Sequence, residues 1–143
     1  MLQINVETTV RADLESVWGA WTNPEDIKQW NAASEDWHTT SSSVDLREGG
    51  AFCSRMEAKD GSMGFDFRGT FTRIHPHELI EYVLDDERRV LVEFAKELQG
   101  VRVRETFDAE SETDDEQQRA GWQAILDNFA RYVELKLGHG RPS

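Results

Sequence analysis

Apolar and polar residues alternate with a period of two in several segments, and this alternation predicts β-strands with one buried face. The predicted strands cover residues 3–10, 51–58, 65–72, 79–84, 88–98 and 100–107. Residues 31–43 are polar and rich in Ser and Thr, with Trp37 as their one large apolar residue, and we interpret them as a further, irregular strand. Gly- and Pro-containing turns, such as Asp60-Gly61, separate the later segments.

Helical spacing replaces the alternation directly after the first strand. Asp13 is a residue type that caps helix N-termini, and it precedes the apolar positions Leu14, Val17, Trp18 and Trp21. Asn23 is a second good cap, and proline suits the first helical position that follows it. The sequence therefore predicts two short helices, the second from Pro24 to about Trp30.

A long amphipathic helix is predicted near the C-terminus. It follows an acidic run over residues 108–116, in which Thr113 and Glu116 have the spacing of a capping box. We expect the helix to run to about Leu137 and to end at Gly138. Its apolar stripe, which we expect to be among the most buried parts of the chain, comprises Trp122, Ile125, Leu126, Phe129 and Val133.

The order of these elements predicts an α+β fold. One strand, two short helices, further antiparallel strands and one long helix give a curved sheet of six to seven strands that needs a cover on its inner face. The long helix lying in the curve of the sheet is the economical cover. A length of 143 residues fits one domain over residues 1–143.

Charge and composition restrict the possible functions. The net charge is −12, which disfavours nucleic-acid and anionic membrane partners. The single cysteine, Cys53, excludes an intramolecular disulfide and a four-cysteine zinc site. The N-terminal residues do not resemble a signal peptide, and no apolar stretch is long enough to span a membrane. We expect a soluble, cytoplasmic protein, a monomer or weak homodimer, without metal or other cofactor.

Four segments in this order resemble the START-like helix-grip (SRPBCC) superfamily and, within it, the Aha-type domain, named after an activator of a heat-shock chaperone ATPase. These segments span nearly the whole chain and are Val17–Glu25 with Trp30, Arg55–Ala58 with Asp60-Gly61, Phe67–Phe71, and Gly121–Phe129. The resemblance implies an apolar cavity between the concave sheet and the long helix. Members bind lipids, hormones or polyketides, and some catalyse cyclisation or dehydration. The segment after Trp30 departs from relatives, which often carry a second Trp and a Gly-Pro pair there.

Glu105 is the main candidate for chemistry. It shares a predicted strand face with Val101, Val103 and Phe107. If this face lines a cavity, desolvation raises the pKa of the carboxyl group, which then serves as a general acid or as a handle for a ligand hydroxyl. The alternative is a carboxylate in water at the cavity mouth or paired with an arginine.

The remaining polar candidates have a structural alternative each. Arg55 and Arg68 are suited to bind a ligand carboxylate, or else pair across strands with Glu57 or Asp66. His75 and His77 flank a proline and lack a third metal ligand nearby, so they indicate an exposed turn. His38, beside Trp37, is a better candidate for a pocket, and its structural alternative is an ordinary surface position.

We predict a binding site for a small apolar molecule, formed by the inner strand faces and the long helix. Its residues are Trp37, Met56, Phe67, Phe71, Glu105 and Phe129. One alternative is a cyclase- or dehydratase-like enzyme with Glu105 or His38 as acid or base. Another is a chaperone-interacting module, which we consider weaker because relatives that activate the chaperone usually carry an additional N-terminal domain that this sequence lacks.

Overall fold

A seven-stranded antiparallel sheet forms the frame of the protein, in a computed structural model that describes residues 2–111 and 113–138. The strand order is β1-β7-β6-β5-β4-β3-β2. The strands are β1 (Gln3–Val10), β2 (Trp37–Val44), β3 (Ala51–Ala58), β4 (Gly64–His75), β5 (Leu79–Leu84), β6 (Arg89–Glu97) and β7 (Gly100–Asp108). The α+β fold with six to seven strands is thereby confirmed. The polar strand is shorter than predicted, because residues 31–36 form a loop before β2.

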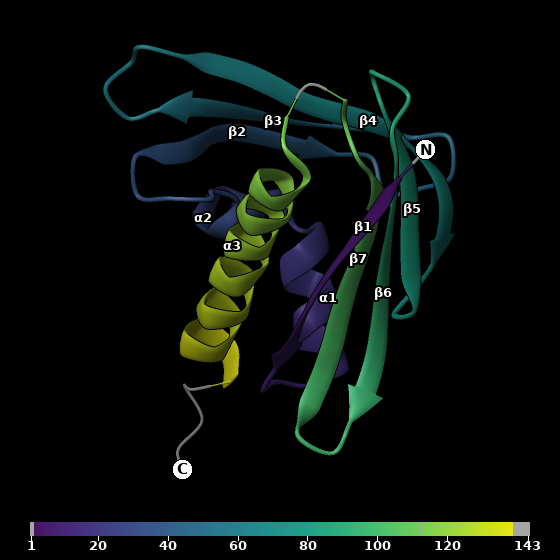
Figure 1. The fold of residues 1–143 in the computed structure, drawn as a ribbon. Helices are drawn as coiled ribbons and strands as arrows, with labels where there is room; N and C mark the ends of the chain where they lie inside the picture. Colours follow the sequence, from purple (N-terminus) through teal and green to yellow (C-terminus); the bar gives the residue numbers. More distant parts are fainter. Residues whose placement is uncertain (1, 112, 139–143) are drawn as a thin grey trace.

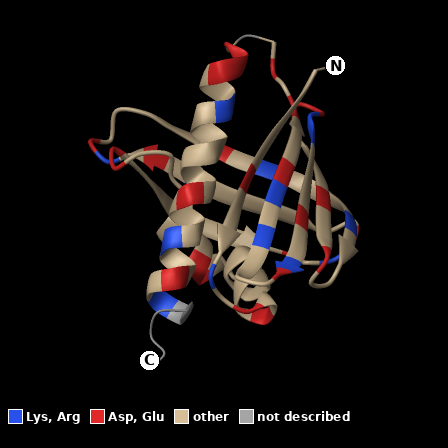
Figure 2. Ribbon diagram, turned by 60° about the horizontal axis from the view of Figure 1, so that its bottom comes forward, with Lys and Arg blue, Asp and Glu red and all other residues tan. Residues whose placement is uncertain are grey.

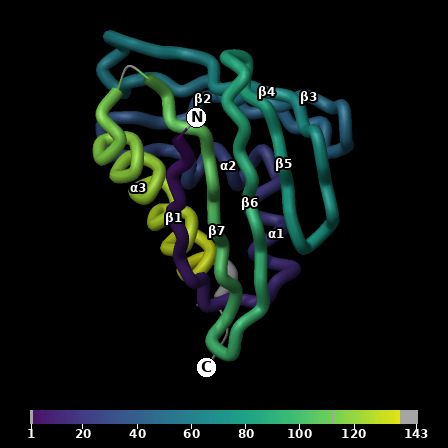
Figure 3. The backbone as a smooth tube through the Cα atoms, turned by 45° about the vertical axis from the view of Figure 1, so that its right-hand side comes forward, coloured from purple at the N-terminus to yellow at the C-terminus, as the bar shows by residue number. Residues whose placement is uncertain are grey.

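The sheet curls strongly, so that β2, β3 and β4 run across the direction of β1, β7 and β6 (Figure 1). The pairing register shifts between Thr39 and Ser41 in β2 and between Phe71 and Arg73 in β4. Such irregularities bend a strand and increase its twist. All three α-helices lie on the inner side of the curl (Figures 1 and 3).

Two short helices, α1 (Leu14–Thr22) and α2 (Pro24–Trp30), follow β1 as predicted. The Asp13 carboxylate accepts a hydrogen bond from the Ser16 N–H at 2.7 Å, and the Asn23 side chain accepts one from the Glu25 N–H at 2.9 Å. Both predicted caps are therefore confirmed. The Trp30 indole N–H donates to the Ala20 carbonyl at 3.0 Å and joins the two helices.

The long helix α3 (Asp115–Val133) continues as a π-helical turn, η1 (Glu134–Gly138). Its N-cap is Asp114, whose carboxylate accepts from the Gln117 N–H, so the predicted capping box that begins at Thr113 is wrong by one residue. The physical reason is a competing bond, because the Thr113 hydroxyl donates to the Glu110 carboxylate at 2.6 Å.

The core lies between the sheet and the inner face of α3. Leu126, Phe129 and Val133 are fully buried, and the Phe129 ring packs edge-on against Trp21 and Trp30 at centroid distances of 4.8 and 4.9 Å. Trp122 and Ile125 are only half-buried, contrary to the prediction for the whole stripe. They differ because they border an open pocket rather than closely packed side chains.

The outer face of the sheet carries charged side chains on every strand except β2. Acidic and basic bands lie beside one another across neighbouring strands (Figure 2). Cross-strand ion pairs such as Arg104 with Glu7 and Arg102 with Glu97, both at 3.3 Å, stabilise this face modestly. No helix within the described residues has the length and apolar character needed to cross a membrane.

Candidate functional site

A pocket of about 430 Å³ lies between α3, the short helices and the inner faces of β3, β4, β5 and β7. Its volume is in the range of sites that hold small organic molecules. Most lining residues are apolar, and the charged ones are Arg88, Glu105 and Glu110. The alternation of each strand explains this wall, because every second side chain of a strand points to the same face.

Aromatic rings form much of the wall and support one another. Trp122 on α3 stacks on Phe107 at a centroid distance of 3.9 Å and an angle of 13°, and meets Phe67 on β4 edge-on at 6.2 Å. Phe52 contacts Phe67 at 5.9 Å and Tyr82 at 4.8 Å. A wall of mutually packed rings resists collapse into the pocket and presents a rigid apolar surface to a guest.

Five of the six predicted site residues line this pocket. They are Trp37, Met56, Phe67, Phe71 and Glu105. Phe129 is outside the lining and has no exposed surface, because the rings of Trp21 and Trp30 enclose it. The predicted placement of Phe129 is therefore wrong, and Ile125 and Trp122, one and two turns earlier on α3, line the pocket instead.

Glu105 lies on the buried face of β7, together with Val103 and Phe107. Its partners across the sheet are Val6 on β1 and Val92 on β6, and its side chain is 5% exposed. Within the described part of the chain, no hydrogen bond or ion pair reaches its carboxyl group. Burial raises the pKa of this carboxyl from 4.5 to about 8. The alternative of a solvated or arginine-paired Glu105 is therefore wrong, and the group is mostly protonated at neutral pH.

Tyr82 adds a second buried polar group to the same pocket. The side chain is 7% exposed, and none of the hydrogen bonds in the described structure involves its hydroxyl. Burial, together with the nearby Glu105, raises the pKa of the phenol, so the hydroxyl stays protonated at neutral pH. Sequence analysis missed this residue, although the alternation of Ile80, Tyr82 and Leu84 on β5 was a sufficient signal.

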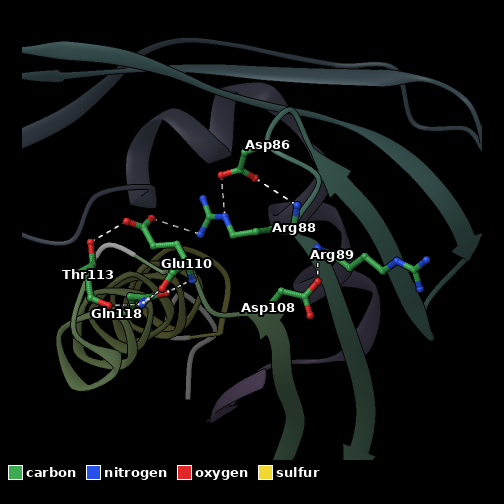
Figure 4. A network of polar contacts seen from close by, with 7 residues as sticks. All are labelled: Asp86, Arg88, Arg89, Asp108, Glu110, Thr113 and Gln118. Carbon is green, nitrogen blue, oxygen red and sulfur yellow. Dashed lines mark hydrogen bonds and ion pairs between the residues drawn. The ribbon is translucent and has the colours of Figure 1, made fainter. Parts of the chain in front are cut away.

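The third polar part of the lining is an ion-pair network at Arg88 (Figure 4). The Arg88 guanidinium donates from Nε to the Asp86 carboxylate at 2.8 Å, and its Nη1 lies 3.7 Å from Oε2 of Glu110. The Glu110 carboxylate also accepts a hydrogen bond from the Thr113 hydroxyl. The Gln118 side-chain amide accepts a hydrogen bond from the Glu110 N–H and donates one to the Glu110 carbonyl. Arg88 and Glu110 both lie outside strands and helices, because β6 begins one residue later than predicted, at Arg89, and Glu110 follows the end of β7.

The other sequence candidates lie elsewhere. Arg55 pairs with Glu57 at 3.0 Å and with Asp66 at 3.4 Å, as its structural alternative predicted, whereas Arg68 pairs with Asp85 and not with the predicted Glu57 or Asp66. His38 is exposed and outside the pocket lining, which confirms the surface alternative for this residue. No group of three or more His, Cys, Asp or Glu side chains within the described ranges is arranged to hold a metal ion.

The chain matches one protein family and resembles several solved structures in both sequence and fold. The sequence profile of the family described as "Activator of Hsp90 ATPase homolog 1-like protein" matches residues 11–134. The solution structure of an AHSA1-like protein from Aeromonas hydrophila is 52% identical over 99% of both chains, with a TM-score of 0.92. That of Chr148 from Cytophaga hutchinsonii is 41% identical over 98% of this chain and 97% of its own, with a TM-score of 0.81. No protein with a curated description matches.

Proposed function

The chain belongs to the family of Activator of Hsp90 ATPase homolog 1-like proteins, as its helix-grip resemblance predicted, and we propose that it binds a small apolar or amphipathic molecule in the pocket beneath α3. The observation that carries this proposal is an open, mainly apolar pocket bordered by the carboxyl group of Glu105, a residue that is 5% exposed and whose carboxyl has no hydrogen-bond partner among the described residues. A soluble protein that leaves such a space unfilled forgoes packing energy that a guest molecule restores.

Desolvation supplies the affinity in this proposal. Each 100 Å² of apolar surface removed from water contributes about 2.5 kcal/mol, before the costs of immobilising the guest. Trp37, Met56 and Phe67 provide apolar contacts, and Glu105 orients the guest by a hydrogen bond. This division into apolar walls and one polar handle is typical of small-molecule sites.

Filling the pocket tests the proposal. Met56 is 7% exposed and lines the pocket, whereas Met63 is 65% exposed and does not line it. We expect the neutral fluorophore N-phenyl-1-naphthylamine to bind the wild type saturably and the Met56→Trp variant at least tenfold more weakly. Met63→Trp is the matched control and should bind like the wild type. Equal affinity in the two variants, or no saturable binding to the wild type, would contradict the proposal.

Acid–base catalysis on a bound molecule is a second candidate function. It is favoured by the pKa of about 8 that burial gives Glu105, because a carboxyl group that is protonated near neutral pH is suited to act as a general acid. Turnover of an aromatic polyketide-like substrate that is lost in Glu105→Gln, while binding persists, would support this candidate. Unchanged turnover in that variant would exclude Glu105 as the acid.

A further inference from the structure

The surroundings of Glu105 restrict the kind of molecule that complements it. On the two neighbouring strands the register places Val6 and Val92 opposite it, and neither side chain offers a hydrogen-bond donor. Glu105 as a residue is only 5% exposed, yet it lines the pocket. A guest in the pocket is therefore positioned to supply the hydrogen-bond donor that the neighbouring strands do not offer to the Glu105 carboxyl group.

The other charged groups of the lining do not neutralise Glu105. Arg88 is the one cation among the lining residues described, and its guanidinium is engaged by Asp86 and Glu110. Tyr82 stays uncharged, because burial raises the pKa of its phenol. The ionisable groups of the described lining are therefore two carboxyls, one guanidinium and one phenol. None of them places an unpaired positive charge beside the Glu105 carboxyl group.

Two further features favour a cation. The lining includes the rings of Phe52, Phe67, Tyr82 and Trp122, and aromatic faces attract ammonium groups, most strongly when both are desolvated. The chain carries a net charge of −12, which raises the local concentration of cations and repels anions.

We propose that the pocket selects molecules that carry a protonated amine on an apolar body, with the ammonium against the Glu105 carboxylate and the body between Trp122 and the inner faces of β3, β4 and β5. This inference rests on the proposed function and names its ligand class. A neutral alcohol of the same shape fills the pocket without an ion pair. A carboxylate of the same shape finds no free cation in the lining and must displace Asp86 or Glu110 from Arg88 to form an ion pair.

Proton release distinguishes the amine from its neutral analogue. The ammonium binds the ionised form of Glu105, whereas the free pocket holds mostly the protonated form at pH 7, since burial places the pKa of this carboxyl at about 8. Binding of the amine therefore releases close to one proton at pH 7. Its affinity should rise by up to tenfold per pH unit below pH 8 and then level off, and the alcohol should show neither effect.

Titration calorimetry with three naphthyl probes tests the inference. The probes are 2-(1-naphthyl)ethylamine, 2-(1-naphthyl)ethanol and 1-naphthylacetate, each measured at pH 7 in two buffers of different ionisation enthalpy. We expect the amine to bind the wild type at least tenfold more tightly than the alcohol, with proton release, and the acetate to bind most weakly. In Glu105→Gln the amine should fall to the affinity of the alcohol and release no proton, while the alcohol is little changed. Glu93→Gln, which alters an exposed carboxylate on β6, is the matched control and should behave as the wild type.

The outcomes separate the ligand class from the function. Alcohol binding as tight as amine binding, or amine binding without proton release, would overturn the amine class and leave the proposed function standing. Absence of amine binding would also overturn the amine class. Failure of all three probes and of N-phenyl-1-naphthylamine would overturn the proposed function as well.

Discussion

Replacing Glu105 with glutamine should stabilise the folded chain at neutral pH, and by an amount that depends on pH. The unfolded carboxyl is ionised at pH 7, whereas the folded one is held protonated by a pKa raised from 4.5 to about 8. Stability from this group is complete below its unfolded pKa and is lost as the pH rises through the folded pKa. Each pH unit between the two pKa values lowers the free energy of unfolding of the wild type by about 1.4 kcal/mol. Relative to its value below pH 4, the free energy of unfolding is therefore lower by about 3 kcal/mol at pH 7 and by about 5 kcal/mol above pH 8. Glutamine does not titrate, so the Glu105→Gln variant does not lose this part of the free energy of unfolding as the pH rises.

Urea unfolding of both proteins at pH 5, 6, 7 and 8 measures this effect. The difference in free energy of unfolding between Glu105→Gln and the wild type should grow by about 1 kcal/mol per pH unit over this range, while contributions of all other groups cancel. Glu93→Gln, on the exposed face of β6, should show a difference of less than about 0.5 kcal/mol at each pH. A difference between Glu105→Gln and wild type that does not change with pH would refute the reasoning.

Three further predictions concern the core, the long helix and partners. Phe129→Ala should lower the free energy of unfolding by about 3–5 kcal/mol, because Phe129 has no exposed surface, and Ile125→Ala at the pocket edge should cost clearly less in the same urea titration. A chain ending at Arg119 lacks most of α3 and should aggregate, as size-exclusion chromatography would reveal; a soluble, cooperatively melting product would contradict this. Elemental analysis should find no stoichiometric zinc, and DNA should not bind at low salt, given the net charge of −12.

Strand alternation was enough to place most of the pocket wall. Glu105 is buried as its parity with Val103 and Phe107 on β7 implied, because partners on both sides of the strand fix its register. Met56 and Phe67 face the pocket for the same reason. The acid was recognised as a candidate because a charged residue on an otherwise apolar face is conspicuous in the sequence.

The features that the sequence analysis misplaced depend on distances between elements and on local hydrogen bonds. The periodicity of apolar residues carries no information about either. Helical phase assigns Trp122, Ile125 and Phe129 to one stripe, but whether a residue of the stripe meets a void or packed rings depends on how far α3 stands from the sheet at that level. The cap of α3 was misplaced because Thr113 and Asp114 are both good caps, and the bond from Thr113 to Glu110 decides between them.

Isoleucine methyl spectra provide the most direct test of binding in the pocket. The chain has five isoleucines, of which Ile27, Ile80 and Ile125 line the pocket and Ile4 and Ile74 do not. Titration of a protein with ¹³C-labelled isoleucine δ1 methyls with N-phenyl-1-naphthylamine should shift the first three resonances through ring currents and leave the other two in place. Shifts confined to Ile4 and Ile74, or no shifts at saturating probe, would contradict the assignment of the binding site to this pocket.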